Sequence, residues 1–588
     1  MNESSTDKES SNSSYSGKKN FPRIIKTFSP SEKLLFLIFL IVFIASTLNI
    51  AHAVNKNMLV EVPSSGGTYK EGIVGSPRFI NPLLAQSDAD RDLTALIYSG
   101  LMRATPDGTL THGIAKSHTV SEDGLTYAVF LREDATFHDG EKVTADDVIF
   151  TVNLIQNPTI KSPRRGSWEG VLVERVNDIE ILFTLEHPYA PFIENLTLGI
   201  LPKHIWENAN AEEITFSEFN TNPIGSGPYK LDTIKRSSSG IPVYYDLEAF
   251  PDYTLGEPFI KTVRIYFYPN EDFLIDAYIN NNIDAINSIS TNNLAYAELN
   301  TDKMPIRRVP LPRIFGVFFN QNQASVFAYI EIRKALDVAL DKERIIVEVL
   351  GGFGTTIESP LPPGILPPRT LDEEELEEEE LSQKKLAIDI LERNGWEVNN
   401  ETGVWEKKTK DGLERLEFSI STSNIPELKA VAGIVQEEWE AIGAKVDVKI
   451  FETGDLNQNV IRPRKYDALL FGEIVGRELD LFAFWHSSQR NDPGLNIALY
   501  ANITADALLE EARTIHDKNE RMEKFIEFEQ EIFDDIPAVF MYAPDFIYVV
   551  PENAVGIELG PITTPSERFL NIHEWHIHTD SVWSFFVN

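Results

Sequence analysis

One short stretch of the chain gathers residue types that can do chemistry. Residues Ala135–Val152, ATFHDGEKVTADDVIFTV, contain His138 and four acidic residues. Imidazole and carboxylate groups this close together can bind a metal ion, or can transfer protons as a general base and acid. The stretch therefore poses a choice between a catalytic or metal site and a structural role for the same side chains.

The residues around His138 predict a strand followed by a turn. In the preceding segment LTYAVFLRE, the side chains of Tyr127, Val129 and Leu131 alternate onto one face, which is typical of a half-buried strand. The tripeptide His-Asp-Gly then supplies residues that tolerate the left-handed backbone of a tight turn.

The acidic residues after the turn fit the start of a helix. Thr144 is a good N-cap, and Asp147 three residues later completes a pair that resembles a capping box. Asp146 and Asp147 also complement the positive end of the helix dipole. The apolar residues that follow at helical spacing are Val148, Val152 and Ile155. Every polar residue of the stretch thus has a structural role, and we favour that role over metal binding or catalysis.

Two other segments could suggest a metal site. HEWHIH, His573–His578, lacks the HExxH spacing of zinc peptidases, and no third ligand for His576 and His578 is evident. The acidic run Leu371–Lys385 lacks the loop spacing of an EF-hand and is predicted to be the solvated start of a helix. The chain also has no nucleophile elbow, P-loop or dinucleotide-binding motif. We therefore expect neither an enzyme nor a resident metal or cofactor.

The composition limits the classes of function. The chain has 588 residues, which is too long for one compact core and predicts two or more lobes. Its formal net charge of -37 argues against nucleic acid as a partner, because phosphates would be repelled. With no cysteine, it can form no disulfide, thiolate zinc site or lipid-modified cysteine anchor.

The N-terminal region predicts export of the rest of the chain. Residues 1–33 are polar, look disordered and carry most of their charge as Lys and Arg close to the next segment. Leu34–Val54 is uncharged over 21 residues, long enough for a transmembrane helix of roughly 30 Å. The positive-inside rule places residues 1–33 in the cytoplasm and the bulk outside. A cleaved signal peptide with its site near Ala51–Ala53 is the alternative, and both interpretations export the remainder.

The exported part alternates strand-like and helix-like segments. ERLEFSIST predicts a strand, PELKAVAGIVQEEWEAIG a helix, and AKVDVKIFE and YDALLFGEI two further strands. Such alternation indicates an α/β layer with a largely parallel sheet.

Several motifs in a fixed order resemble the family 5 extracellular solute-binding proteins, which include the oligopeptide- and dipeptide-binding components of ABC importers. The segments that carry the resemblance are GGTYKEGI, PRFINPLL, LIYSGLMRATPDGTL, TFHDGEKVTADDVIFTV, NPIGSGPYKL, YDALLFGEI, FWHSSQ and NIHEW. The match runs from about Gly66 to His576 and covers nearly the whole exported part.

The resemblance implies an α/β clamshell, similar to a periplasmic binding protein, with an inserted domain in the first lobe and an N-terminal transmembrane helix before it. We expect the first lobe over residues 60–315, with the insertion at about 92–215. The second lobe would take residues 320–535, and residues 536–588 would return to the first lobe. The two crossings between the lobes are expected near Arg313–Asn322 and Asp535–Tyr542.

The resemblance also implies a set of ligand contacts in the cleft. These are Arg78, Phe79, Ile80, Asn320, Gly472, Glu473, Ile474, Val475, Glu478, Asp480, Trp485 and Tyr542. For each, a solvated loop or a packing position is the structural alternative, and for Trp485 core packing is favoured. Peptide binders of the family often carry Gly-Trp followed by an Asp that pairs with the ligand amine. Here Gly476 and Arg477 stand where that acid would fall, and the remaining candidates are Glu473, Glu478 and Asp480.

The expected function is that of a membrane-tethered extracytoplasmic receptor, which delivers peptides to the permease of an ABC importer. Its partners would be a peptide or another small solute, the permease and, through the N-terminal helix, the cell membrane. The alternatives are an extracellular sensor, a binder of a sugar or metal complex, and a zinc hydrolase that uses the histidines near residue 576.

Overall fold

The computed structural model describes residues 29–291, 293–294, 305–365, 383–410 and 412–587 of the 588-residue chain. The chain divides into two compact units, Met1–Ser64 with His578–Asn588, and Ser65–Ile577. Of the predicted polar N-terminal region, residues 1–28 lie outside the described residues, as does most of the acidic run.

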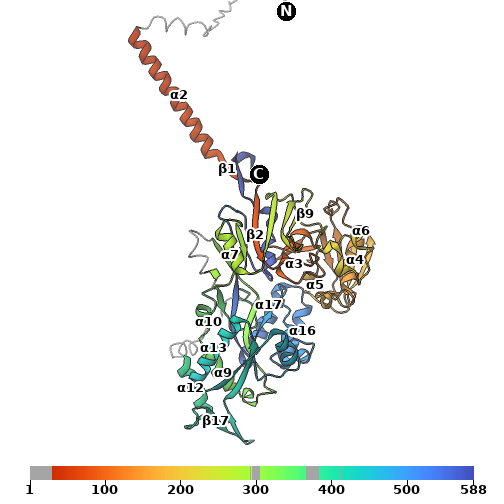
Figure 1. Ribbon diagram of the computed structural model, residues 1–588, viewed down its shortest axis with the longest axis vertical. Helices are drawn as coiled ribbons and strands as arrows, with labels where there is room; N and C mark the ends of the chain where they lie inside the picture. The colour runs from red at the N-terminus through yellow and green to blue at the C-terminus, as the bar shows by residue number, and fades with distance from the viewer. Residues whose placement is uncertain (1–28, 292, 295–304, 366–382, 411, 588) are drawn as a thin grey trace, which may run out of the picture. The chain divides into compact units, whose positions relative to one another are not determined.

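The smaller unit contains a long apolar helix and a two-stranded sheet (Figure 1). Helix α2 (Pro30–Met58) begins at Ser29, whose backbone N–H donates to the Glu32 carboxylate at 2.8 Å. Within the described residues, α2 is the one helix long and apolar enough to cross a bilayer, and it has no buried residue. Strand β1 (Leu59–Ser64) then pairs antiparallel with β23 (His578–Trp583), and the 3-10 turn η9 (Ser584–Phe586) follows. The predicted apolar helix is confirmed and extends four residues beyond each end of the uncharged stretch.

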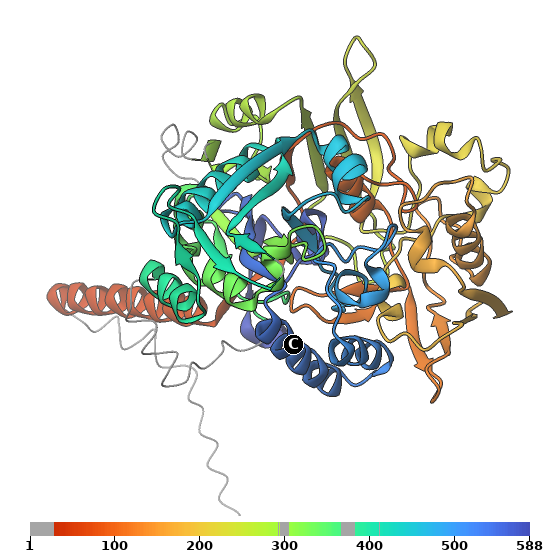
Figure 2. The same ribbon diagram turned by 90° about the horizontal axis from the view of Figure 1, so that it is seen from below.

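The larger unit has a first lobe built on a mixed sheet. Its strands are β2 (Thr68–Val74), β9 (Tyr229–Arg236), β10 (Pro242–Ala249), β11 (Thr262–Tyr268), β12 (Ala285–Asn287), β13 (Ile306–Pro310) and the second half of β22 (Ala538–Val549). β2 runs parallel to β11 and β12, and the other pairs are antiparallel. Helices α3 (Asp88–Ile97) and α7 (Glu271–Ile279) pack on its strands. The β9–β10 hairpin projects from the body of the unit and is olive-yellow in Figure 2.

The second lobe is a sheet with helices on both faces. Its strands are β14 (Arg313–Phe319), β15 (Gly354–Thr356), β19 (Glu417–Ser423), β20 (Lys445–Phe451), β21 (Ala468–Ile474) and the first half of β22. One face carries α9 (Ile330–Ala339), α10 (Lys342–Glu348), α12 (Gln383–Arg393) and α13 (Pro426–Ala441). The other carries α15 (Phe482–Trp485), α16 (Ile503–Thr514) and α17 (Lys518–Asp535). Alternate residues of β14 serve the two faces, since Val317 packs with α9 and α13 and Phe318 with α16 and α17.

Strand β22 belongs to both lobes. Residues Ala538–Tyr542 pair with β14, whereas Asp545–Val549 pair with β13, so one strand joins the two sheets into a continuous ladder. The chain passes from β13 to β14 through Leu311 and Pro312, which gives two neighbouring connections between the lobes. Because both connecting strands run antiparallel to their partners, the sheets are mixed, and the expected largely parallel sheet was wrong. The domain boundaries proposed from the sequence stay predictions.

A four-stranded antiparallel sheet lies in the sequence between α3 and β9. Its order is β5 (Ala115–Val120), β6 (Thr126–Leu131), β8 (Glu180–Thr184) and β7 (Leu172–Asn177), and helix α4 (Ala145–Gln156) packs against it. The predicted strand, turn and helix are confirmed here, with Gly140 at a φ of 91° in the turn. Asp147 accepts hydrogen bonds at 2.8 Å from the backbone and hydroxyl of Thr144 and from the backbone N–H of Lys203.

A buried ion cluster ties the late part of the chain to the first lobe. Arg568, in the 3-10 turn η7 (Pro565–Phe569), pairs with Glu71 of β2 at 2.5 Å and Asp92 of α3 at 2.6 Å. All three side chains are fully buried, and Tyr548 of β22 donates to Glu71 at 2.7 Å. Burial raises the pKa of Glu71 and of Asp92, while the Arg568 guanidinium opposes that rise. Loss of Arg568 would therefore leave two acids in the core without a cation.

Candidate ligand-binding site

Two adjoining cavities form a cleft between the lobes of the larger unit. Their volumes are about 230 and 240 Å³, and they share Arg164, Glu194, Thr197, Thr564 and Glu567 as lining residues. The second lobe contributes the loop Gly476–Asp480, which follows β21. A molecule in this cleft would therefore contact both lobes at once.

The loop after β21 is held against the first lobe by two acids. The backbone N–H groups of Arg477 and Glu478 each donate to the Glu194 carboxylate at 3.2 Å. The Arg477 guanidinium pairs with Glu567 at 2.6 Å and donates to the Pro561 carbonyl at 3.0 Å. Burial raises the pKa of Glu194, and the two backbone donors offset part of that rise. These contacts act as a latch between the lobes.

Two of the predicted contacts, Glu478 and Asp480, line the cleft, but each already has a cation. Glu478 pairs with Arg521 at 2.5 Å. Asp480 pairs with Arg513 at 3.0 Å and accepts a hydrogen bond from the Tyr189 hydroxyl at 2.9 Å. Both acids therefore stabilise the second lobe and the latch, and neither is left over for a ligand amine in this arrangement.

The cleft also contains two guanidinium groups that have no carboxylate within ion-pair distance among the described residues. Among the described residues, Arg103 and Arg164 form no ion pair, and the buried Nε of Arg103 lacks a hydrogen-bond acceptor. Desolvation lowers the pKa of Arg164 and the nearby charge of Arg91 lowers it further, whereas the carboxylates of Glu194 and Glu567 raise it. Arg91 lines the same cavity and lies 3.6 Å from Asp88. Arg164 is exposed and Arg103 is half-buried, so a carboxylate brought by a ligand could reach both guanidinium groups.

The predicted contacts Arg78, Phe79 and Ile80 belong to the loop between β2 and α3, here called the first loop, and do not line these two cavities. The backbone N–H groups of Arg78 and Phe79 donate to Asp90 at 2.6 and 2.8 Å, which fastens the loop to the start of α3. Ile80 is fully buried in the first-lobe core, and the Arg78 side chain is exposed. The neighbouring residues Pro82 and Ala85 line the cleft instead.

The predicted contacts on β21 and just after it also lie outside the two cavities. Gly472 stands against the Phe315 ring, where an added Cβ would come within 2.6 Å of a ring carbon. Ile474 is exposed and Val475 is buried in the core. Glu473 is buried beside Trp485, and neither its carboxyl oxygens nor the indole nitrogen has a well-aligned hydrogen-bond partner among the described residues. Burial raises the pKa of Glu473 well above its usual range, although the nearby indole lowers it slightly.

The remaining three predicted contacts have structural partners. Asn320 is buried, and its side chain donates to the Arg464 carbonyl at 3.0 Å while accepting from two backbone N–H groups of the following turn. The Tyr542 ring stacks on Phe315 at 4.9 Å, and its hydroxyl donates to Glu427 at 2.8 Å. Trp485 is fully buried in the core between β14 and α16.

Sequence reasoning missed most of the cleft. Arg103, Arg164, Glu194 and Glu567 belong to no local motif, because they come from segments far apart in the sequence. Arg477 is the exception: it stands where related binders place an acid, and this departure was visible in the sequence alone.

The histidine of the opening stretch has a structural role. His138 lies between two backbone segments, with its Nδ1 3.3 Å from the Gly225 N–H and its Nε2 3.1 Å from the Gly227 carbonyl. Burial lowers the pKa of His138 to about 4, so the ring is neutral at ordinary pH. Within the described residues, no group of three or more His, Asp or Glu side chains could hold a metal ion. Among the described residues, the histidines near residue 576 likewise belong to no such group.

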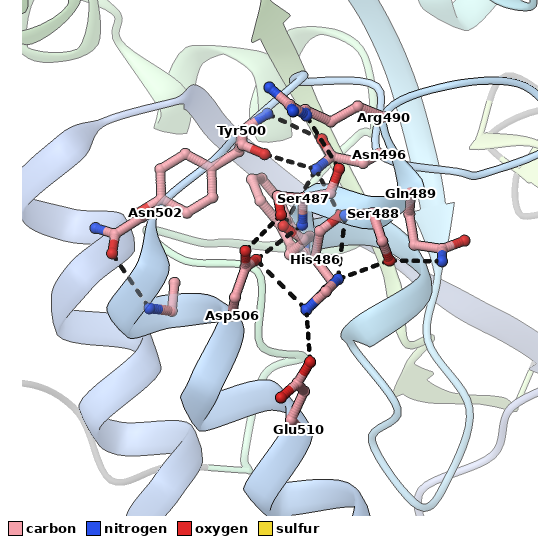
Figure 3. Close-up of polar contacts among 12 residues, drawn as sticks. His486, Ser487, Ser488, Gln489, Arg490, Asn496, Tyr500, Asn502, Asp506 and Glu510 are labelled. Carbon is pink, nitrogen blue, oxygen red and sulfur yellow. Dashed lines mark hydrogen bonds and ion pairs between the residues drawn. The ribbon is translucent and has the colours of Figure 1, made fainter.

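A second polar cluster places a serine, a histidine and an acid together (Figure 3). His486 Nδ1 lies 2.7 Å from the Ser488 hydroxyl, and its Nε2 lies 3.3 Å from Glu510. However, Nδ1 also accepts the Ser488 backbone N–H at 3.1 Å, which makes His486 the cap of the short turn Ser487–Gln489. Asp506 fastens the same turn by accepting the Ser487 backbone N–H at 2.8 Å. None of these residues lines the cleft, so the cluster stabilises a turn of the second lobe.

Comparison with known proteins agrees with this architecture. Residues 109–492 match the model of the bacterial extracellular solute-binding proteins, family 5 Middle. The oligopeptide-binding protein AppA of Bacillus subtilis is 30% identical over 519 residues, which cover 87% of this chain and 92% of that protein. The dipeptide-binding protein of Escherichia coli is 24% identical over 515 residues, covering 83% and 91%.

Solved structures give the same result. AppA from B. subtilis in complex with a nonapeptide matches with a TM-score of 0.65 at 29% identity, over 88% of this chain and 100% of that one. NikZ from Campylobacter jejuni in complex with Ni(L-His) matches with a TM-score of 0.66 at 28% identity, over 87% and 99%. The two-lobed α/β fold predicted from the sequence is thereby confirmed. The chain belongs to the bacterial extracellular solute-binding proteins of family 5.

Proposed function

We propose that this protein captures peptides outside the cytoplasm and delivers them to the permease of an ABC importer. The observation that carries the proposal is the cleft, because its lining comes from both lobes and combines carboxylates that are buried or half-buried with guanidinium groups that form no ion pair in the described part of the chain. The relatives named for oligopeptide and dipeptide binding support the choice of ligand class.

The two connections between the lobes suggest how capture works. Closure around a ligand adds contacts that the open form lacks, so binding shifts the population towards the closed form. The latch of Arg477 with Glu567, and of Glu194 with the loop backbone, would form only on closure. A permease could then distinguish loaded from empty receptors by their shape, and no bond of the ligand need be broken.

The charges of the cleft suggest how a peptide would be oriented. A ligand carboxylate would pair with Arg164 and Arg103, which form no ion pair with another described residue, although Glu194 and Glu567 lie near Arg164. Glu194, at the junction of the two cavities, would face a ligand amine. The family resemblance implies further contacts, at the first loop, Asn320, β21 and Tyr542. These contacts stay predictions.

We further propose that α2 is retained as a single-pass anchor, with residues 1–33 in the cytoplasm and the bulk outside. Its capped start and its 29-residue length support a continuous spanning helix. Tethering would keep the receptor near its permease and raise the effective concentration. Mass measurement of the membrane-extracted protein tests the anchor, because cleavage near Ala53 would remove the N-terminal segment.

Native mass spectrometry of the protein as purified tests the ligand class. A ladder of co-purifying masses, assigned to short peptides by fragmentation, is the expected result. A single uniform non-peptide mass would replace the peptide with another solute. Conversion of added peptides to shorter products would contradict the role as a binder.

A further inference from the structure

A group of exposed aromatic side chains follows strand β23. Trp583, Phe585 and Phe586 are 42%, 56% and 75% exposed, and we refer to them as the aromatic cluster. The ring centroids of Trp583 and Phe585 are 5.4 Å apart, and those of Phe585 and Phe586 are 4.3 Å apart. The cluster therefore presents a continuous apolar surface that the described part of the chain does not cover.

A hydrogen bond holds the aromatic cluster beside the end of the apolar helix. The Trp583 indole N–H donates to the Asn55 side-chain oxygen at 2.7 Å. Asn55 follows directly on the uncharged stretch Leu34–Val54, whose rise of about 30 Å matches the hydrocarbon thickness of a bilayer. With α2 across a membrane, Asn55 and Trp583 lie at the level of the lipid headgroups. Aromatic side chains, tryptophan above all, collect at that level in membrane proteins.

The two-stranded sheet is apolar at the end next to α2 and becomes polar towards its other end. The pairs nearest the helix are apolar, Leu59 opposite Trp583 and Val60 opposite Val582. The pairs farther along include Glu61 opposite Ser581 and Ser64 opposite His578. A sheet that stands on a membrane surface needs this order, because its near end meets lipid and its far end meets water.

We propose that the aromatic cluster is a second membrane contact, which inserts into the headgroup region of the leaflet from which α2 emerges. The proposal rests on the proposed role of α2 as a retained anchor. The cluster would fix the sheet of β1 and β23 against the bilayer surface, so the sheet could not swing freely about the end of α2. The partner is the lipid interface itself, and no second protein is required.

The absence of cysteine makes the proposal testable in the full-length chain. We would make three single-cysteine variants, Ile41→Cys, Phe586→Cys and Thr579→Cys, and label each with an environment-sensitive fluorophore. Each labelled protein is reconstituted alone in vesicles of phosphatidylcholine and phosphatidylglycerol. Ile41 reports on the apolar helix, and the exposed Thr579 is the matched control at the polar end of the sheet. We expect blue-shifted emission and reduced iodide quenching at positions 41 and 586, and water-like behaviour at 579.

The tryptophans provide a measurement without a label. Trp583 is the one exposed tryptophan among eight, since the other seven are at most 3% exposed. Lipids brominated near the headgroup should therefore quench the full-length protein more strongly than lipids brominated deep in the chains. Trp583→Phe should remove that difference.

The outcomes separate the cluster from the anchor. A lipid-shielded position 41 with a water-exposed position 586, or no loss of quenching in Trp583→Phe, would overturn the proposal and leave the anchor intact. Water-like emission at both positions would overturn the anchor, and the membrane contact with it.

Discussion

At the scale of single residues, Glu473 combines full burial with the lack of a cation. Its folded-state pKa is raised by burial, so the native state holds the proton more tightly than the unfolded state. Stability should accordingly fall as the pH rises above the ordinary pKa of a glutamate, 4.5, by up to about 1.4 kcal/mol per pH unit. The loss should continue until the pH passes the folded pKa.

We predict that Glu473→Gln raises the unfolding temperature at pH 8 and changes it little at pH 4.5. The amide copies the shape of the protonated carboxyl without its titration. Thermal unfolding at both pH values measures the difference. Glu401→Gln, at an exposed position, is the control and should show no pH-dependent gain. Equal stability of the wild type and Glu473→Gln at pH 8 would mean that the buried carboxylate is accommodated in its charged form.

Substitution of Arg164 tests whether the cleft binds the carboxylate of a ligand. Arg164→Gln should weaken the binding of a peptide with a free carboxylate about tenfold to a hundredfold, since hydrogen bonds to charged groups contribute about 1.5–3 kcal/mol. The same peptide with an amidated C-terminus should bind the wild type and the variant nearly equally. Isothermal titration calorimetry with both peptides provides the comparison. An equal loss for the two peptides would show that Arg164 supports the cleft without pairing with the ligand carboxylate.

At the scale of elements, helix α4 depends on the buried carboxylate of Asp147. Asp147→Ala leaves the backbone N–H groups of Thr144 and Lys203 without their acceptor, so we expect a loss of about 2–4 kcal/mol in unfolding free energy. Asp146→Ala removes only half-exposed ion pairs with Arg175 and Lys203, and should cost less than about 1 kcal/mol. Denaturant unfolding measures the unfolding free energy of both variants. A similar loss of unfolding free energy in the two would contradict the role of Asp147 as the helix cap.

The elements were largely predictable from sequence, because their signals are local. Alternation at Tyr127, Val129 and Leu131 places the strand, and the spacing of Thr144 and Asp147 places the helix start. Strand direction was less accessible. Whether β14 runs parallel or antiparallel to β21 depends on partners that lie many residues away.

The cleft could not be read from sequence for the same reason. Arg164, Glu194 and Glu567 meet only after three distant segments fold together. In the first loop, the backbone turns Ile80 into the core, whereas Pro82 and Ala85 line the cavity. Family resemblance pointed to this loop, but packing against distant segments decides which of its side chains face the cavity.

At the scale of the whole larger unit, Arg477 connects the lobes. Arg477→Ala removes the ion pair with Glu567 and the hydrogen bond to Pro561. Without ligand, we expect the variant to have a larger radius of gyration than the wild type. At saturating peptide, we expect the two proteins to have the same radius of gyration. Small-angle X-ray scattering measures both states. Arg462→Ala, which breaks the exposed pair with Asp492 inside the second lobe, is the control. An unchanged radius of gyration in Arg477→Ala would show that the latch does not hold the lobes together.

Strand β22 governs when each lobe can finish folding. Glu71 and Asp92 are synthesised and translocated early. Strand β22, which pairs with β13, and Arg568, which neutralises both acids, are synthesised only when the chain is nearly complete. Until then the first lobe contains two unneutralised acids and an incomplete sheet edge, which opposes early collapse. Nascent chains that stop short of residue 538 should consequently remain sensitive to protease across both lobes, and this late closure suits a protein that crosses a membrane before it folds.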